Sequence, residues 1–388
     1  MNETKKHRAA GIDILKTLAV VFVVCVHFFM KTYYYKTPVD NSIMFLQSYL
    51  RWIFVTSVPL FLLCTGYLEW KKEAGAEYYR KIFRVVIPYA LISIICIFWN
   101  IAFFDKSIGF REGIYSIFNF SADSYSWYVN MYIGLFFLIP VFNYAIKALD
   151  RKRLGYVIIS LVFIIAAPSF FNPILKLHPD FRFIYFPDWW KGIYPVMYYF
   201  VGAYISKYRP TVKKSVCIAV IAGVPSLQTL LQMYLNSVKF DNWRFTDYSN
   251  ILTLVLSTSI FLLLYQVDIK HNAPKKIFRK ISSLTLEIYL LSNLTDKGIY
   301  GHFKENVFPQ NEKLPQNEVF LKYFLIIVPL TFSAAFIFAF AFDILYKNGR
   351  KAFIGIIKKT GIYDKVEEIR LRRRKNESED KCEASVTE

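Results

Sequence analysis

The sequence predicts an all-α, polytopic membrane protein, a bundle of about ten transmembrane helices with both termini in the cytoplasm. Composition, the spacing of apolar runs and the distribution of basic residues all point to this fold. Of the 388 residues, 55% are hydrophobic and 20% are charged, against roughly 45–50% and 25% in soluble domains. The net charge of +19 lies in short runs between apolar stretches. We therefore attribute it to membrane topology and expect no nucleic-acid partner.

Ten mostly apolar segments are about as long as a membrane-crossing helix, which needs roughly 20 residues. Loops with mixed charge and aromatic residues separate them. The expected spans are residues 12–31, 45–69, 82–104, 127–147, 154–172, 190–207, 214–235, 250–268, 281–300 and 319–346.

The connecting segments alternate in charge. The N-terminal tail and the second, fourth, sixth and eighth connections are short and rich in Lys and Arg, whereas the others are longer and mixed. The positive-inside rule then places both termini in the cytoplasm, which requires an even number of spans. We expect a cytoplasmic tail over 1–11, a transmembrane domain over 12–346, and a basic, partly disordered cytoplasmic tail over 347–388. The sequence carries no signal for oligomeric state.

The first span holds three ionisable residues, Asp13, Lys16 and His27. Each is costly inside a membrane and needs a structural or functional reason. Lys16 and His27 are eleven positions apart, so they share one helix face and are separated by about three turns. Two other readings exist: Lys16 paired with Asp13 and reaching the headgroups, or a neutral His27 hydrogen-bonded to a neighbouring helix.

The second span carries Arg51 at about the depth expected for His27, so both side chains could line one outward-facing cavity. The alternative is an Arg that reaches the lipid headgroups. Pro59 and Gly66 in the same span indicate a broken helix, which is tolerated where the backbone faces protein or a cavity.

Two further features point to a polar ligand. Glu287 lies about six residues from the inner end of the ninth span, where it could face Lys16. Trp189 and Trp190 follow an acidic residue in an expected outer loop. Aromatic faces beside polar groups suit sugar rings, although an interfacial aromatic belt is the simpler explanation for the two Trp residues. His7, His178, His271 and His302 are scattered, and we expect no metal site.

Several segments together resemble the acyltransferase-3 family of integral-membrane acyltransferases. The first carries a basic residue, ten intervening positions and a His, as the family's first helix does. The resemblance covers roughly residues 8–345. The matching segments are Arg8 to Lys16 with His27, Val58 to Phe61 with Thr65 to Leu68, Tyr79 to Arg84 with Pro88-Tyr89, Trp127 to Leu135 with Pro140, Tyr198 to Tyr204, and Ser283 to Leu290.

The resemblance implies transfer of an acyl group, often acetyl, from cytoplasmic acyl-coenzyme A to a hydroxyl of a cell-surface or lipid-linked glycan. Acyl-CoA is then a co-substrate, and no permanently bound cofactor is expected. The resemblance also implies that His27 is catalytic and that Lys16 is its partner on the donor side. The implied location is the plasma membrane, in contact with lipid.

Three segments depart from the family's pattern. Lys16 replaces the usual Arg, so the charge remains but the planar guanidinium fork is lost. Ser292 stands where the ninth-helix segment usually has a His, and Glu287 replaces a Gly. Tyr125 and Ser126 stand before the fourth-span Trp, where a His is common. These departures are also compatible with a family member that has no catalytic activity.

The expected mechanism uses His27 as a general base, because a neutral imidazole can accept a hydroxyl proton near physiological pH. Arg51 could stabilise the oxyanion. We expect Arg80, Lys81 and Arg84 to hold the coenzyme A phosphates, although positive-inside topology alone also accounts for them. Direct transfer and an acyl-histidine intermediate both remain open. The residues expected to bind the acceptor are Trp127, Tyr128, Trp189, Trp190 and Glu287.

A function from another class also fits these features. An exporter or flippase for polysaccharide or lipid-linked sugar would equally need charges within the membrane, a broken helix and aromatic outer loops. The hydropathy shows no inverted repeat, which disfavours an alternating-access carrier.

Overall fold

The computed structural model describes residues 10–104, 107–175, 186–238, 248–307 and 315–359, and within these ranges the regular elements are all helical. In chain order they are α1 (Ala10–Lys31), η1 (Tyr34–Lys36), α2 (Ser42–Phe54), α3 (Ser57–Glu69), α4 (Ala76–Tyr79), η2 (Arg80–Ile82), α5 (Phe83–Phe103), α6 (Phe110–Phe118), α7 (Trp127–Ala148), α8 (Arg151–Leu175), η4 (Asp188–Ile193), α9 (Tyr194–Tyr208), α10 (Lys214–Val238), α11 (Ile251–Leu264), α12 (Asn272–Ser283), α13 (Thr285–His302), η5 (Phe303–Val307) and α14 (Gln316–Lys359).

Among the described residues, seven helical segments are long and apolar enough to cross a membrane, so this is a multi-pass membrane protein. Helices also form at the sixth, eighth and ninth expected spans, but they differ from the other seven. The helices α9 and α11 have only 15 and 14 residues, and α13 carries Glu287, Asp296 and Lys297. Ten spans and cytoplasmic termini therefore stay predictions. The seven segments are Ala10–Lys31, Ser42–Glu69, Ala76–Phe103, Trp127–Ala148, Arg151–Asn172, Lys214–Leu235 and Gln316–Ile356.

The chain divides into two compact units, Met1–Phe336 and Ile337–Glu388. The described part of the second unit is the end of α14, which runs to Lys359 and so continues past the end expected for the last span at residue 346. The expected N-terminal tail up to residue 9 and the C-terminal tail from residue 360 lie outside the described residues.

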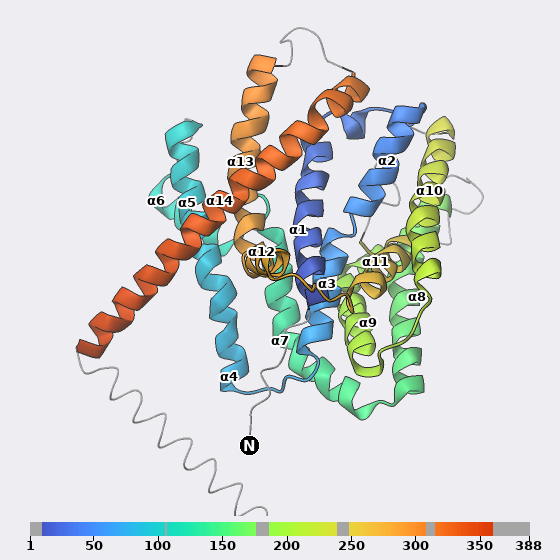
Figure 1. Cartoon of the computed structure of the whole chain (residues 1–388), viewed down its shortest axis with the longest axis horizontal. Helices are drawn as coiled ribbons and strands as arrows, with labels where there is room; N and C mark the ends of the chain where they lie inside the picture. Colours follow the sequence, from blue (N-terminus) through green and yellow to red (C-terminus); the bar gives the residue numbers. More distant parts are fainter. Residues whose placement is uncertain (1–9, 105–106, 176–185, 239–247, 308–314, 360–388) are drawn as a thin grey trace, which may run out of the picture. The chain divides into compact units, whose positions relative to one another are not determined.

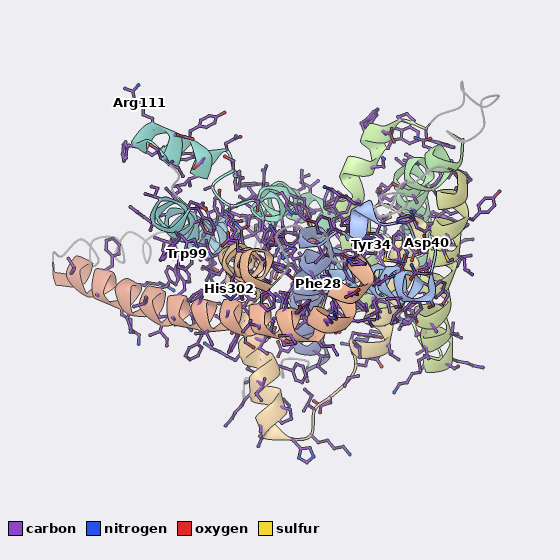
Figure 2. All side chains as sticks on the ribbon, turned by 90° about the horizontal axis from the view of Figure 1, so that it is seen from above. Phe28, Tyr34, Asp40, Trp99, Arg111 and His302 are labelled. Atoms are coloured by element: carbon purple, nitrogen blue, oxygen red, sulfur yellow. The ribbon has the colours of Figure 1, made fainter. Side chains whose placement is uncertain are left out.

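Helix α1 lies inside the first unit and organises it. It packs against α2, α3, α11, α12 and α13, and Figure 1 shows it between α13 and α2. Asp13 in its first turn and Lys31 in its last turn suit the helix dipole. Phe28 and Tyr34, both labelled in Figure 2, belong to one aromatic core cluster near the end of α1. Most of α1 is buried, so its polar side chains face other helices.

The expected break in the second span exists, but it lies at a different place from the one predicted. Helix α2 ends at Phe54 and α3 begins at Ser57. Pro59 is therefore in the first turn of α3, where the missing N–H has no helical partner to lose. Gly66 lies inside α3 and does not interrupt it; its role is in packing.

Two glycines allow α3 and α9 to approach closely. A Cβ atom on Gly66 would overlap the carbonyl oxygen of Tyr199, and one on Gly202 would overlap the carbonyl oxygen of Leu63. Small residues at such crossings let helix backbones pack tightly within a membrane, where no hydrophobic force drives helices together. This packing explains the glycine in each of two segments that the sequence marks as motifs.

Replacing Gly202 by Val should destabilise the protein by about 1–3 kcal/mol, because the new side chain must push two helix backbones apart. The measurement is the unfolding midpoint of the purified protein in detergent. Gly223→Val in α10 is the matched control, since nothing lies within 4 Å of a Cβ atom there. Equal losses in both variants would contradict close packing at Gly202.

Candidate functional site

A cavity of about 520 Å³ opens beside the second half of α1. Its wall combines the imidazole of His27, two cationic side chains and several aromatic rings from α1, α2, α7, α13 and the adjoining segments. The lining residues are Val23, Val26, His27, Met30, Lys31, Tyr35, Arg51, Val55, Ser57, Val58, Ser124, Tyr125, Trp127, Tyr248 and Tyr289.

His27 lies against a buried carboxylate and an aromatic ring. Its Nδ1 is 2.9 Å from Oδ2 of Asp296, and both side chains are almost fully buried. Within the described residues, Nδ1 forms no aligned hydrogen bond. The hydroxyl of Tyr125 donates to the same Oδ2 at 2.5 Å, and the Tyr125 ring stacks on the imidazole with centroids 3.9 Å apart. The carboxylate thus fixes two polar side chains at one point.

The segment before α7 is tied to α13, and this holds Tyr125 in place. The hydroxyl of Tyr289 donates to the carbonyl oxygen of Tyr125 at 2.5 Å, and the Ser124 hydroxyl donates to Oδ1 of Asn293 at 3.0 Å. The N–H of Tyr125 donates to Oδ1 of Asp123 at 2.8 Å. Burial raises the pKa of Asp123 to about 7. Burial, and then the charge of Asp296, raise the pKa of Tyr125, which keeps it a neutral O–H donor.

A second cavity, of about 200 Å³, lies along the first half of α1 and contains Lys16 in its wall. Val23, Val58 and Tyr289 line both cavities, so the two adjoin. The structure therefore places the two residues that the first-span spacing singles out on the walls of neighbouring cavities. The lining residues are Lys16, Val23, Val58, Phe61, Thr65, Val85, Tyr128, Val129, Tyr132, Thr285, Leu286 and Tyr289.

The aromatic residues expected to bind the acceptor divide into two groups. Trp127 lines the larger cavity and Tyr128 the smaller one. Trp189 and Trp190 belong to η4 and are absent from both linings. Trp189 is 75% exposed, and its ring meets that of Trp190 edge to face at 6.2 Å.

The expected donor-binding residues lie at the turn that leads into α5. Arg80 and Arg84 are exposed and Lys81 is half-buried, with Nζ 5.7 Å from the centroid of the Tyr78 ring. Arg84 directly precedes Val85, which lines the smaller cavity. Glu287 is half-buried in the first turn of α13, next to a lining residue but outside both lining sets.

A model of the acyltransferase domain of the acyltransferase-3 family matches residues 9–343, which is most of the chain. This chain belongs to the acyltransferase-3 family. No curated protein and no solved structure gives a match. The family assignment, together with the apolar helices, makes the chain a multi-pass membrane acyltransferase.

Two departures of this acyltransferase-3 protein from the family's pattern lie at or near the His27 cavity. Tyr125 stands near the expected His before the fourth span, and it stacks on His27. Ser292, in place of the ninth-helix His, is fully buried, and its hydroxyl donates to the carbonyl oxygen of Tyr289 at 2.7 Å. One turn beyond Ser292, α13 supplies Asp296.

Asp296 is the residue that the sequence analysis missed. A signal for it exists, because Tyr289, Asn293, Asp296 and Tyr300 recur at spacings of three and four along α13 and so share one face. All four are buried. A buried polar stripe in an expected span marks a functional face.

Proposed function

We propose that this acyltransferase-3 protein moves an acyl group, acetyl in the first instance, from cytoplasmic acyl-CoA to a hydroxyl of a cell-surface or lipid-linked glycan. Its site of action would be the plasma membrane, and His27 would be the general base. One observation carries this proposal. His27, 2.9 Å from Asp296, lines a large cavity that adjoins the one lined by Lys16.

The chemistry needs a base, a bound thioester and a hydroxyl at one point. A small rotation of the imidazole aligns Nδ1–H with Asp296 and leaves Nε2 free to accept a proton. Such alignment often tightens only when substrate binds. Nε2 takes the hydroxyl proton, the oxygen attacks the thioester carbonyl, and the C–S bond breaks. The proton then passes to the thiolate of coenzyme A. Direct transfer of this kind needs no acyl-enzyme.

The donor would enter along the smaller cavity. Coenzyme A is polyanionic, so Arg80, Lys81 and Arg84 are suited to its phosphates, and Lys16 to a polar group of the pantetheine arm. The shared wall at Val23, Val58 and Tyr289 supports a path from Lys16 toward His27. Arg51 and Trp127 in the larger cavity would face the acceptor.

Inverted membrane vesicles with and without the protein test the donor side. Radiolabelled acetyl-CoA added outside such vesicles meets the cytoplasmic face. We expect label to enter the glycan fraction only when the protein is present, and to leave as free acetate after mild base, because esters hydrolyse readily. Equal labelling of both vesicle preparations would contradict the proposal.

Lys16→Arg should retain most acyl transfer, whereas Lys16→Ala should lose it by about tenfold or more, because only the first keeps a cation at the cavity wall. The readout is the same vesicle assay at matched protein amounts. Lys214→Ala, at the exposed start of α10, is the control for loss of a positive charge. Equal activity of the two Lys16 variants would remove any role for the cation.

A further inference from the structure

Arg51 is a buried cation that has no acidic partner within the described residues. It is 3% exposed, yet it lines the larger cavity. Nε donates to the hydroxyl of Tyr35 at 2.9 Å, and the guanidinium carbon lies 5.2 Å and 5.1 Å from the ring centroids of Tyr35 and Trp52. Nη1 is buried and has no hydrogen-bond partner in the part of the chain that the structure describes. Among the described residues no carboxylate forms an ion pair with Arg51.

Burial of an unpaired charge is expensive, because the lost hydration is not replaced. Phenol oxygens and ring faces compensate the guanidinium only in part. A polar group that is left unsatisfied in a binding cavity is most simply explained by a ligand that satisfies it. For a guanidinium with free N–H groups, that ligand group is an oxyanion.

The other charged side chain in the described cavity lining is also positive. Lys31 is the second cation in the lining, and its Nζ is 5.9 Å from the centroid of the Tyr125 ring. The described residues of the lining include no Asp or Glu. In the nearby carboxylate of Asp296, Oδ2 accepts a hydrogen bond from Tyr125 and lies 2.9 Å from Nδ1 of His27.

We propose that the acceptor is anionic, with a phosphate or carboxylate group bound by Arg51 and Lys31 while its hydroxyl faces His27. The inference rests on the proposed function and specifies its substrate class. It differs from a role for Arg51 at a transient oxyanion, because a permanent anion binds before any acyl donor is present. The aromatic walls at Tyr35, Trp127 and Tyr248 would cover the faces of the sugar ring.

Binding of three simple probes to the purified full-length protein, without acyl-CoA, tests this inference. Glucose 1-phosphate and glucuronate represent the two possible anions, and glucose is the neutral match. Thermal unfolding at constant ionic strength reports binding, because a ligand of the folded state raises the midpoint. We expect one anionic sugar to raise it and glucose to have no effect at the same concentration; which anion acts identifies the charged group.

Arg51→Gln should weaken that binding about tenfold or more, since a charge-assisted hydrogen bond is lost. Lys31→Gln, at a less buried position, should weaken binding of the anionic sugar by a smaller factor. It replaces Arg51→Gln as the test variant if Arg51→Gln fails to fold. Lys36→Gln removes an exposed charge of η1 outside the lining and should bind as the wild type does. The inference is overturned if neither anion binds, if glucose binds as tightly, or if both cavity variants retain full binding.

His27→Gln separates this inference from the proposed function. It should keep the anion-induced shift in midpoint while losing acyl transfer. A protein that binds the anion but transfers no acyl group in any form would retain the anion site and refute the acyltransferase proposal. A protein that acylates glycan but prefers glucose over both anions would retain the acyltransferase proposal and refute the anionic acceptor.

Discussion

His27→Gln should lower the rate of acyl transfer by about 10²–10⁴, the contribution of a positioned general base. Gln has a similar size and can still donate to Asp296, so the buried site should fold. It cannot take the proton from the acceptor hydroxyl. The measurement is the initial rate of label transfer from radiolabelled acetyl-CoA to glycan in inverted vesicles.

His271→Gln is the matched control for this loss, because His271 is exposed and immediately precedes α12. Its rate should equal that of the wild type. Protein amount in the vesicles is measured for both variants, so that poor insertion is not mistaken for lost catalysis. A His27→Gln variant with wild-type rate would show that another group accepts the proton.

Asp296→Asn should lower kcat by about 10² to 10⁴ with little change in KM for acyl-CoA. The carboxylate lies 2.9 Å from Nδ1 of His27 and would hold the ring so that Nε2 faces the cavity. In a Ser-His-Asp triad, the same exchange costs about 10⁴ in kcat. A residue that acts through the base affects the chemical step more than donor binding. The measurement is kcat and KM from vesicle rates over a range of acyl-CoA concentrations.

Two further variants distinguish positioning of His27 from a merely structural role of Asp296. Asp296→Glu restores a carboxylate and should recover part of kcat. Tyr125→Phe keeps the ring that stacks on His27 and removes one donor to Asp296, so its loss should be nearer tenfold. If Asp296→Asn unfolded at a lower temperature but kept its kcat, Asp296 would stabilise the fold only.

The sequence predicts much of the site because its main feature lies on one helix. Lys16 and His27 are eleven residues apart, and a regular helix places them on one face whatever surrounds it. The structure puts both on cavity walls. Arg51 lines the same cavity as His27. Hydropathy likewise predicts the helices, although the spans expected at α9 and α11 are longer than the helices that form there.

The remainder of the site depends on contacts between distant parts of the chain. Asp296 meets His27 across 269 residues of sequence, and Tyr125 meets Asp296 across 171. No local pattern specifies such pairs, because they are set by how α13 and the segment before α7 pack on α1. The polar spacing in α13 identifies its functional face but not the residue that the face meets.

The most direct test is the mass of the surface glycan from cells that lack the protein and are supplied with either the wild type or His27→Gln. We predict that the wild type adds acyl esters and that His27→Gln makes the same amount of glycan without them. Glycan with the same ester content in both would contradict a catalytic His27. Loss of the glycan itself in cells without the protein would instead indicate an exporter.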